Sequence, residues 1–221
     1  MGRKVDLDFF QEYSASVSEE HRYFTRIEST NYLFFKRIYE IFFSLVGLIP
    51  ASLIILLFAI LIKLETPGPA FFLQERVGLN GKYFKVIKLR SMGLDAEKDG
   101  AKWADKEDPR VTRVGLFIRK TRIDELPQLW NILVGDMSLI GPRPERPMFT
   151  AQFNEQIPGF VERLRVKPGL TGWAQINGGY DVTPQEKLNL DLYYINNLSL
   201  FLDLKILLRT VVICFTGSGA R

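Results

Sequence analysis

Two adjacent carboxylates, Asp124 and Glu125, stand between a cluster of basic residues and a stretch with helix-forming character. The run reads Arg119-Lys120-Thr121-Arg122-Ile123-Asp124-Glu125-Leu126-Pro127-Gln128-Leu129-Trp130-Asn131, and Gly141-Pro142-Arg143-Pro144 follows a short distance downstream. A carboxylate in such a place can bind Mg²⁺ or attack phosphorus, while arginines and helix amides stabilise bound phosphate. The pattern therefore predicts chemistry on a diphosphate.

A simpler interpretation of the pair exists. Asp124 is a good N-cap residue, and Pro127 is tolerated nearby because first-turn amides lack intrahelical acceptors. We therefore expect the pair at the start of a helix, where the carboxylates could merely offset the helix dipole. Arg143 lies in a loop stiffened by prolines, where it can bind phosphate or pair with a structural carboxylate.

Length and composition limit what surrounds this pair. The 221 residues leave room for one domain, or for one domain and a membrane element. Basic residues cluster at 76–90 and 110–122, which favours anionic ligands or anionic lipid, although a solvated basic face is the alternative. The single cysteine, Cys214, excludes an intramolecular disulfide. With one histidine and no Cys-x-x-Cys, a zinc site is not expected.

An uncharged apolar run covers residues 41–62. As a helix it would extend roughly 33 Å, which is bilayer length. Pro50 divides the run nearly in half, and a helix is expected to kink or break there. Basic residues flank both ends, so the positive-inside rule gives no direction. We predict a helix-break-helix that enters one leaflet and returns; a kinked single span is the alternative.

The remaining chain alternates short apolar runs with turns, and it predicts two strands around a turn at 78–81. Apolar spacing predicts a helix on each side of the Asp-Glu pair. A final amphipathic helix is expected either in the membrane interface or packed on the core. The expected elements are strands at 70–74 and 83–89, an exposed helix or loop at 94–108, helices at 114–120 and 127–133, loops at 135–146 and 167–179, and the amphipathic helix at 198–215.

From about Phe35 to Arg221 the chain resembles the bacterial sugar transferases called monotopic polyprenyl-phosphate phosphoglycosyl transferases. Several uncommon motifs occur in the family's order after a membrane segment with a central proline. They are Lys88-Leu89-Arg90-Ser91-Met92, Ile123-Asp124-Glu125-Leu126-Pro127-Gln128, Gly135-Asp136-Met137-Ser138, Gly141-Pro142-Arg143-Pro144, Pro168-Gly169-Leu170-Thr171-Gly172-Trp173-Ala174-Gln175 and Leu202-Asp203-Leu204-Lys205.

The resemblance implies transfer of a sugar-1-phosphate from a UDP-sugar to undecaprenyl phosphate, with release of UMP. Such a reaction initiates the synthesis of capsule, exopolysaccharide, O-antigen or another glycoconjugate. By motif position, Asp124 would be the nucleophile that forms a covalent phosphosugar and would also bind Mg²⁺. Glu125 would orient or deprotonate the lipid phosphate. The residues matched to phosphate or substrate binding are Arg119 and Arg143, with Lys88 and Arg90 as weaker candidates.

The overall expectation is a mainly helical α+β protein at the cytoplasmic face of the bacterial inner membrane. It comprises an N-terminal extension (1–34), a re-entrant membrane helix (35–65) and a catalytic domain (66–221) with amphipathic interfacial helices. The expected partners are a UDP-sugar, undecaprenyl phosphate and the bilayer, with no nucleic acid; a homo-oligomer is left open. A neutral hexose is slightly preferred over an N-acetylhexosamine. The alternative is a single-pass anchor that carries a non-catalytic scaffold or a basic binding module in glycan assembly.

Overall fold

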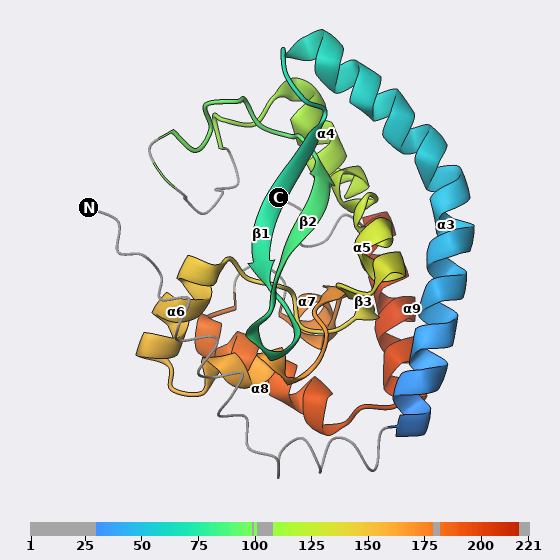
Figure 1. Ribbon diagram of the computed structural model, residues 1–221, viewed down its shortest axis with the longest axis vertical. Helices are drawn as coiled ribbons and strands as arrows, with labels where there is room; N and C mark the ends of the chain where they lie inside the picture. Colours follow the sequence, from blue (N-terminus) through green and yellow to red (C-terminus); the bar gives the residue numbers. More distant parts are fainter. Residues whose placement is uncertain (1–29, 99, 101–107, 179–181, 217–221) are drawn as a thin grey trace.

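The computed structural model describes residues 30–98, 100, 108–178 and 182–216. Within them the protein is mainly helical with two small sheets, and one long apolar helix lies along one side of the molecule (Figure 1). This confirms the coarse class predicted from the sequence. The N-terminal extension lies almost wholly outside the described residues, and the division into 1–34, 35–65 and 66–221 stays a prediction.

The long helix is α3 (Thr30–Glu65), which is apolar and long enough to cross a membrane. Helical structure continues through Pro50, so the expected break of the helix is absent there. Proline removes one hydrogen bond and crowds the preceding turn, which bends a helix without ending it when both flanking arms are long. Figure 1 shows α3 as a bent helix. Its re-entrance into one leaflet stays a prediction.

One stripe of α3 faces the rest of the protein. Lys36, Glu40, Ser44, Ala51 and Ile62 are buried at near-helical spacing along its length. Most apolar side chains on its other faces are exposed, as the 72% exposure of both Ile49 and Leu53 shows. Exposed apolar surface of this extent indicates contact with lipid or another apolar partner.

The hairpin predicted around residues 78–81 is present. Strand β1 (Phe71–Val77) pairs antiparallel with β2 (Tyr83–Leu89), so that Phe71 lies opposite Leu89 and Val77 lies opposite Tyr83. The short 3₁₀ turn η1 (Leu79–Gly81) joins them, with Asn80 in the left-handed region at φ 53°. Asparagine tolerates that conformation better than most residues, which explains why the turn forms here.

Helices flank the Asp-Glu pair as predicted. Helix α4 (Arg113–Lys120) is capped by Thr112, whose side chain accepts a hydrogen bond from the Gly115 amide. The one-turn 3₁₀ helix η2 (Ile123–Glu125) follows, and then α5 (Gln128–Val134). Gly135 ends α5 with φ 96°, a conformation that favours glycine. In Figure 1, α5 lies between the hairpin and α3, and α4 overlaps the upper end of the hairpin in this view.

A second sheet lies within segments expected as loops. Strand β3 (Ser138–Ile140) pairs in parallel with β4 (Gly169–Thr171). The two backbones approach so closely that a Cβ added at Gly169 would lie 2.0 Å from the Gly141 nitrogen, and one at Gly141 would lie 2.3 Å from the Lys167 carbonyl oxygen. Glycine at both positions is therefore required by contact between main chains.

Five further helical elements complete the described part of the fold, among them the short helix α7 (Trp173–Asn177). The other four lie before and after α7 in the chain. They are α6 (Pro147–Gln156), η3 (Phe160–Arg165), α8 (Pro184–Asn196) and α9 (Leu200–Thr216). The amphipathic helix predicted at 198–215 is α9. It buries Leu202 and Ile206 against the core but leaves Phe201 79% exposed, so one apolar face is packed and another is not. The described part of the segment 94–108 forms turns, and no helix is present in that part.

Candidate functional site

The acidic pair lies in η2, immediately before α5. Arg122 precedes the pair in a left-handed conformation with φ 57°, and this turn separates the pair from α4. Asp124 is therefore not an N-cap, which corrects that expectation: Pro127 takes the N-cap position of α5, without a side-chain cap bond. The left-handed turn places the carboxylates inside η2, and Glu125 contacts β2 and the loop after β3.

Glu125 joins three separate segments of the chain. Lys88 of β2 donates from Nζ to Oε1 of Glu125 at 2.8 Å. Arg143, in the loop after β3, donates from Nη2 to the same oxygen and from Nη1 to Oε2 at 3.5 Å. Burial alone raises the pKa of Glu125, but the charges and hydrogen bonds of Arg143 and Lys88 lower this pKa well below its ordinary value. Glu125 is therefore ionised and ion-paired.

Asp124 has the opposite electrostatic character. Its residue is 8% exposed, and burial is the main cause that raises its pKa to about 6. The adjacent charge of Glu125 raises this pKa further, while Lys88, Arg143 and Arg119 lower it. Neighbouring carboxylates with pKa values moved apart are typical of groups with different roles in one site. Asp124 is the carboxylate suited to a metal ion or a phosphorus atom.

The predicted phosphate-binding residues divide into two groups. Lys88 and Arg143 contact Glu125 directly, and the charge of Arg119, in the last turn of α4, acts on Asp124. Arg90 is placed elsewhere. Its guanidinium donates to the Pro67 carbonyl at 2.6 Å and to the Thr66 carbonyl and hydroxyl at 2.9 Å each. The structure thus brings together Lys88, Arg119 and Arg143 with the acidic pair, and it places Arg90 at the end of α3.

A buried ionic cluster supports the loop that carries Arg143. Arg163 donates from Nη2 to the Arg143 carbonyl at 2.9 Å and to Oδ2 of Asp191 at 2.6 Å. Arg76 donates to the Pro144 carbonyl at 2.8 Å, and Lys187 donates to Glu145. Burial tends to raise the pKa of Glu145, but Lys187 and Arg163 outweigh it and lower this pKa to about 2. Arg163 and Arg76 therefore fix the backbone of this loop through charged hydrogen bonds.

Reasoning from the sequence missed this cluster. A signal was nevertheless present: Arg163 lies between Val161 and Leu164, and Asp191 shares the inner face of α8 with Leu188 and Tyr194. Charged residues at positions that periodicity assigns to the core are almost always paired.

The site also suits Mg²⁺. In the described part of the chain, no group of three or more His, Cys, Asp or Glu side chains lies close enough to hold a metal alone. Mg²⁺ does not require such a group, because it is usually held by one or two carboxylates together with substrate phosphates and water. Glu125 already pairs with two cations, so Asp124 is the candidate protein ligand.

The segment 167–179, expected as a loop, contains β4 and α7, and its side chains pack on α8 and α9. Trp173 stacks on Tyr193 with ring centroids 5.2 Å apart, and Lys205 lies 5.3 Å from the Trp173 ring. Asn177 accepts a hydrogen bond from Arg209 at 2.9 Å. Residue 179 lies outside the described residues.

Comparison with known proteins gives a consistent result. Residues 31–217 match the family described as bacterial sugar transferase. Over 164 residues the chain is 60% identical to a Bacillus subtilis (strain 168) protein named, provisionally, as an undecaprenyl-phosphate N-acetylgalactosaminyl 1-phosphate transferase; the match covers 74% of this chain and 90% of the relative.

Two longer relatives match as well. An Aeromonas hydrophila UDP-N-acetylgalactosamine-undecaprenyl-phosphate N-acetylgalactosaminephosphotransferase is 48% identical over 88% of this chain and 47% of its own length. An Escherichia coli (strain K12) UDP-glucose:undecaprenyl-phosphate glucose-1-phosphate transferase is 40% identical over 90% of this chain and 44% of its own length. The chain therefore spans less than half the length of these two relatives.

Proposed function

The chain belongs to the bacterial sugar transferase family, and from that premise we propose that it transfers a sugar-1-phosphate from a UDP-sugar to undecaprenyl phosphate and releases UMP. The observation that carries this proposal is the arrangement of Asp124 beside an ionised Glu125 that pairs with Lys88 and Arg143. Phosphoryl transfer depends mainly on positioned charge and an aligned nucleophile, and this site supplies both.

Asp124 is the nucleophile in the proposed reaction. A carboxylate oxygen of Asp124 attacks the β-phosphorus of the UDP-sugar, and the phosphorus–oxygen bond to UMP breaks with its electron pair leaving on UMP. An oxygen of undecaprenyl phosphate then attacks the same phosphorus. The bond to Asp124 breaks, the carboxylate is regenerated, and the lipid-linked diphosphosugar forms. Lys88, Arg119 and Arg143 offer positive charge to the phosphate oxygens.

Glu125 orients the charged groups in this proposal. Its lowered pKa makes it a weak base, which favours a positioning role over removal of a proton from the lipid phosphate. It holds Lys88 and Arg143 beside η2 by accepting hydrogen bonds from both.

Mg²⁺ is the proposed cofactor, with Asp124 as its protein ligand. When bound, such an ion neutralises charge on the diphosphate and on the departing UMP. The buried position of Asp124 and the engagement of Glu125 by two cations support this assignment.

Helix α3 supports the proposed membrane location. A helix this long and apolar, in a family of sugar transferases, supports a membrane protein. We place the catalytic domain at the cytoplasmic face of the bacterial inner membrane, where a lipid phosphate and a soluble nucleotide sugar can meet. Pro50 and the basic residues on both flanks support a re-entrant α3 with both termini on that face.

The proposed donor is UDP-N-acetylgalactosamine. Two of the relatives described above, at 60% and 48% identity, carry this sugar in their names, and the relative at 40% identity carries glucose. The names therefore favour the N-acetylated sugar over the neutral hexose preferred from the sequence. UDP-glucose is the second candidate.

The decisive experiment is UMP release from a panel of UDP-sugars with Mg²⁺ and undecaprenyl phosphate. Native protein is compared with Asp124→Asn and with a matched control, Asp95→Asn, which changes an exposed aspartate paired only loosely with Lys98 at 3.9 Å. We expect release by the native protein and the control, and neither release nor a covalent adduct with Asp124→Asn. Turnover by Asp124→Asn would refute the nucleophile, and no release by native protein with any donor would favour the scaffold alternative.

A further inference from the structure

One segment of the chain, residues 113–134, carries the acidic pair between two helices. Helix α4 forms its beginning, η2 its middle and α5 its end. Both outer ends of this segment are bound by side chains of α3, the membrane helix. These contacts are separate from the ion pairs that surround Glu125.

At the first end, Glu65 caps α4. Its Oε1 accepts a hydrogen bond from the Arg113 amide at 2.8 Å, and its Oε2 accepts one from the Val114 amide at 3.2 Å. A carboxylate at a helix N-terminus satisfies amides that lack intrahelical partners and interacts favourably with the helix dipole. Phe58 of α3 also stacks on Phe117 of α4, with ring centroids 5.6 Å apart.

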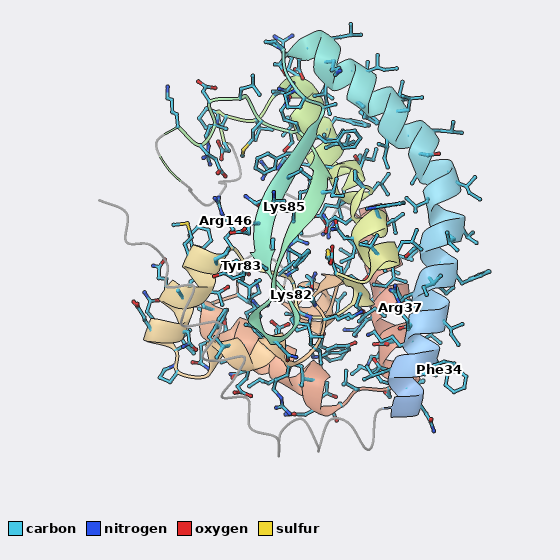
Figure 2. All side chains as sticks on the ribbon, viewed as in Figure 1. Phe34, Arg37, Lys82, Tyr83, Lys85 and Arg146 are labelled. Carbon is cyan, nitrogen blue, oxygen red and sulfur yellow. The ribbon has the colours of Figure 1, made fainter. Side chains whose placement is uncertain are left out.

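At the second end, Arg37 caps α5. Its Nη1 donates to the Ile132 carbonyl at 2.6 Å and its Nη2 donates to the Leu133 carbonyl at 2.8 Å. A guanidinium at a helix C-terminus is the matching electrostatic partner for the last carbonyls. Figure 2 shows Arg37 on the side of α3 that faces the domain, whereas Phe34 points away from it.

The middle of the segment also rests on α3. Ile123, the residue before Asp124, packs against a cluster that contains Ile62 of α3 and Ile118 of α4. Ile62 and Ile118 are 2% and 0% exposed, so the side chains that contact Ile123 are themselves buried in the core. A displacement of α3 would therefore reach Asp124 through closely packed side chains.

The same helix holds the strand that leads to Arg143. One turn after Lys36, Glu40 accepts a hydrogen bond from the Leu139 amide at 3.1 Å and another from the Ser138 hydroxyl. Lys36 donates to the Ile140 carbonyl at 2.8 Å. Helix α3 thus contacts both parts of the site, the segment with Asp124 and the strand before Arg143.

We propose that Glu65 and Arg37 are positioning residues: from the membrane helix they hold the two ends of segment 113–134 and so fix Asp124 relative to Lys88 and Arg143. The inference rests on the proposed function for its effect on turnover, because a small misplacement of a reacting group can lower a rate by up to about 100-fold. Its structural part, that α3 orders this segment, does not depend on which reaction is catalysed.

The test uses the protein in lipid vesicles, with four variants at the two capping positions and two control variants. Glu65→Ala and Arg37→Ala remove each cap, whereas Glu65→Gln keeps one acceptor oxygen and Arg37→Lys keeps one cationic donor. Glu155→Ala, at an exposed carboxylate on α6, and Lys82→Ala, at an exposed cation after η1, are the matched controls. Kinetics of UMP release and amide hydrogen exchange are measured for each protein.

We expect the alanine variants to lose about tenfold in kcat with KM for the UDP-sugar within about twofold of native, because the ligands of the substrate remain while their alignment changes. The conservative variants should retain intermediate kcat. Exchange should accelerate in peptides covering 113–127 for Glu65→Ala and 128–137 for Arg37→Ala, and the controls should match native protein. If an alanine variant does not fold, the conservative variant at that position decides by the same criteria.

Two results would overturn the inference. One is a kcat within about twofold of native in both alanine variants. The other is hydrogen exchange that rises equally over the whole domain and is not concentrated in the named peptides. Failure of the proposed function is a different result, because native protein would then release no UMP. The exchange measurement would still test the contacts of Glu65 and Arg37 in that case.

Discussion

Replacing Glu145 with glutamine should destabilise the protein strongly, although Glu145 touches no proposed substrate. The carboxylate is buried and receives a hydrogen bond from Lys187, with Arg163 at 3.8 Å and Arg76 at 3.9 Å. Arg163 retains Asp191 in the variant, and Arg76 retains the Pro144 carbonyl. Lys187 would lose the carboxylate whose charge offsets the cost of burying its ammonium group. Most of the loss in folding free energy therefore arises at Lys187.

The magnitude follows from the pKa of Glu145, which falls from the ordinary 4.5 to about 2. At about 1.4 kcal/mol per pKa unit, the charged partners stabilise the folded state by about 3 kcal/mol. That agrees with the loss of roughly 3–5 kcal/mol when one partner of a buried ion pair is removed. For a chain of this size, the midpoint of thermal unfolding should fall by roughly 6–12 °C.

The sign of the pH dependence provides a second readout. A carboxylate whose pKa is lowered by folding contributes its full stabilisation above its unfolded pKa, and this contribution is lost as the pH falls through the folded pKa. The contribution of Glu145 is therefore present above about pH 4.5 and disappears toward about pH 2. Native protein should lose its advantage over Glu145→Gln across that window.

The assay is thermal unfolding in detergent micelles, followed by circular dichroism from pH 7 to about pH 2. Glu155→Gln serves as the control at an exposed carboxylate, and the double variant Glu145→Gln/Lys187→Met should recover part of the lost stability because the unpaired cation is removed. A midpoint within about 2 °C of native, or a double variant no more stable than Glu145→Gln, would refute the reasoning.

Three further predictions concern the site and helix α3. Glu125→Gln should lower UMP release by about 100-fold, because Lys88 and Arg143 lose the charge that orients them; unchanged release would remove Glu125 from the site. Because burial raises the pKa of Asp124 to about 6, isothermal titration should show Mg²⁺ affinity falling between pH 7 and pH 5 as the carboxylate takes up a proton; a constant affinity would contradict Asp124 as a ligand. Pro50→Leu should favour a straight span over a re-entrant helix, and an unchanged accessibility of cysteines introduced at both ends of α3 would show that the proline is not decisive.

Local patterns predicted the elements that local chemistry determines. The turn signal around Asn80 placed the hairpin, and apolar spacing placed α4 and α5 on either side of the acidic pair. The long apolar run identified α3, because a helix of membrane length can be recognised from the length and composition of the run alone. The motif order identified the family, which the comparisons confirmed.

Features that depend on distant contacts were not predicted. Strands β3 and β4 are three residues each, too short for alternation to be visible, and they exist because their backbones meet across the fold. The 3₁₀ turn at Asp124 follows from the left-handed Arg122, a residue type with no strong preference for that conformation. Of the kink or break expected at Pro50, the break is absent and the helix is bent, because a missing hydrogen bond bends a long helix more readily than it ends it.

The contact between Gly141 and Gly169 has a consequence for anyone who wishes to alter this protein. Because a methyl group at either position would meet the other main chain, the loop that carries Arg143 and the segment after residue 167 behave as one structural unit. A chimera that exchanges only one of them between relatives would inherit mismatched backbones. Exchanges between relatives should therefore move both segments together, and randomised libraries should leave these two glycines unchanged.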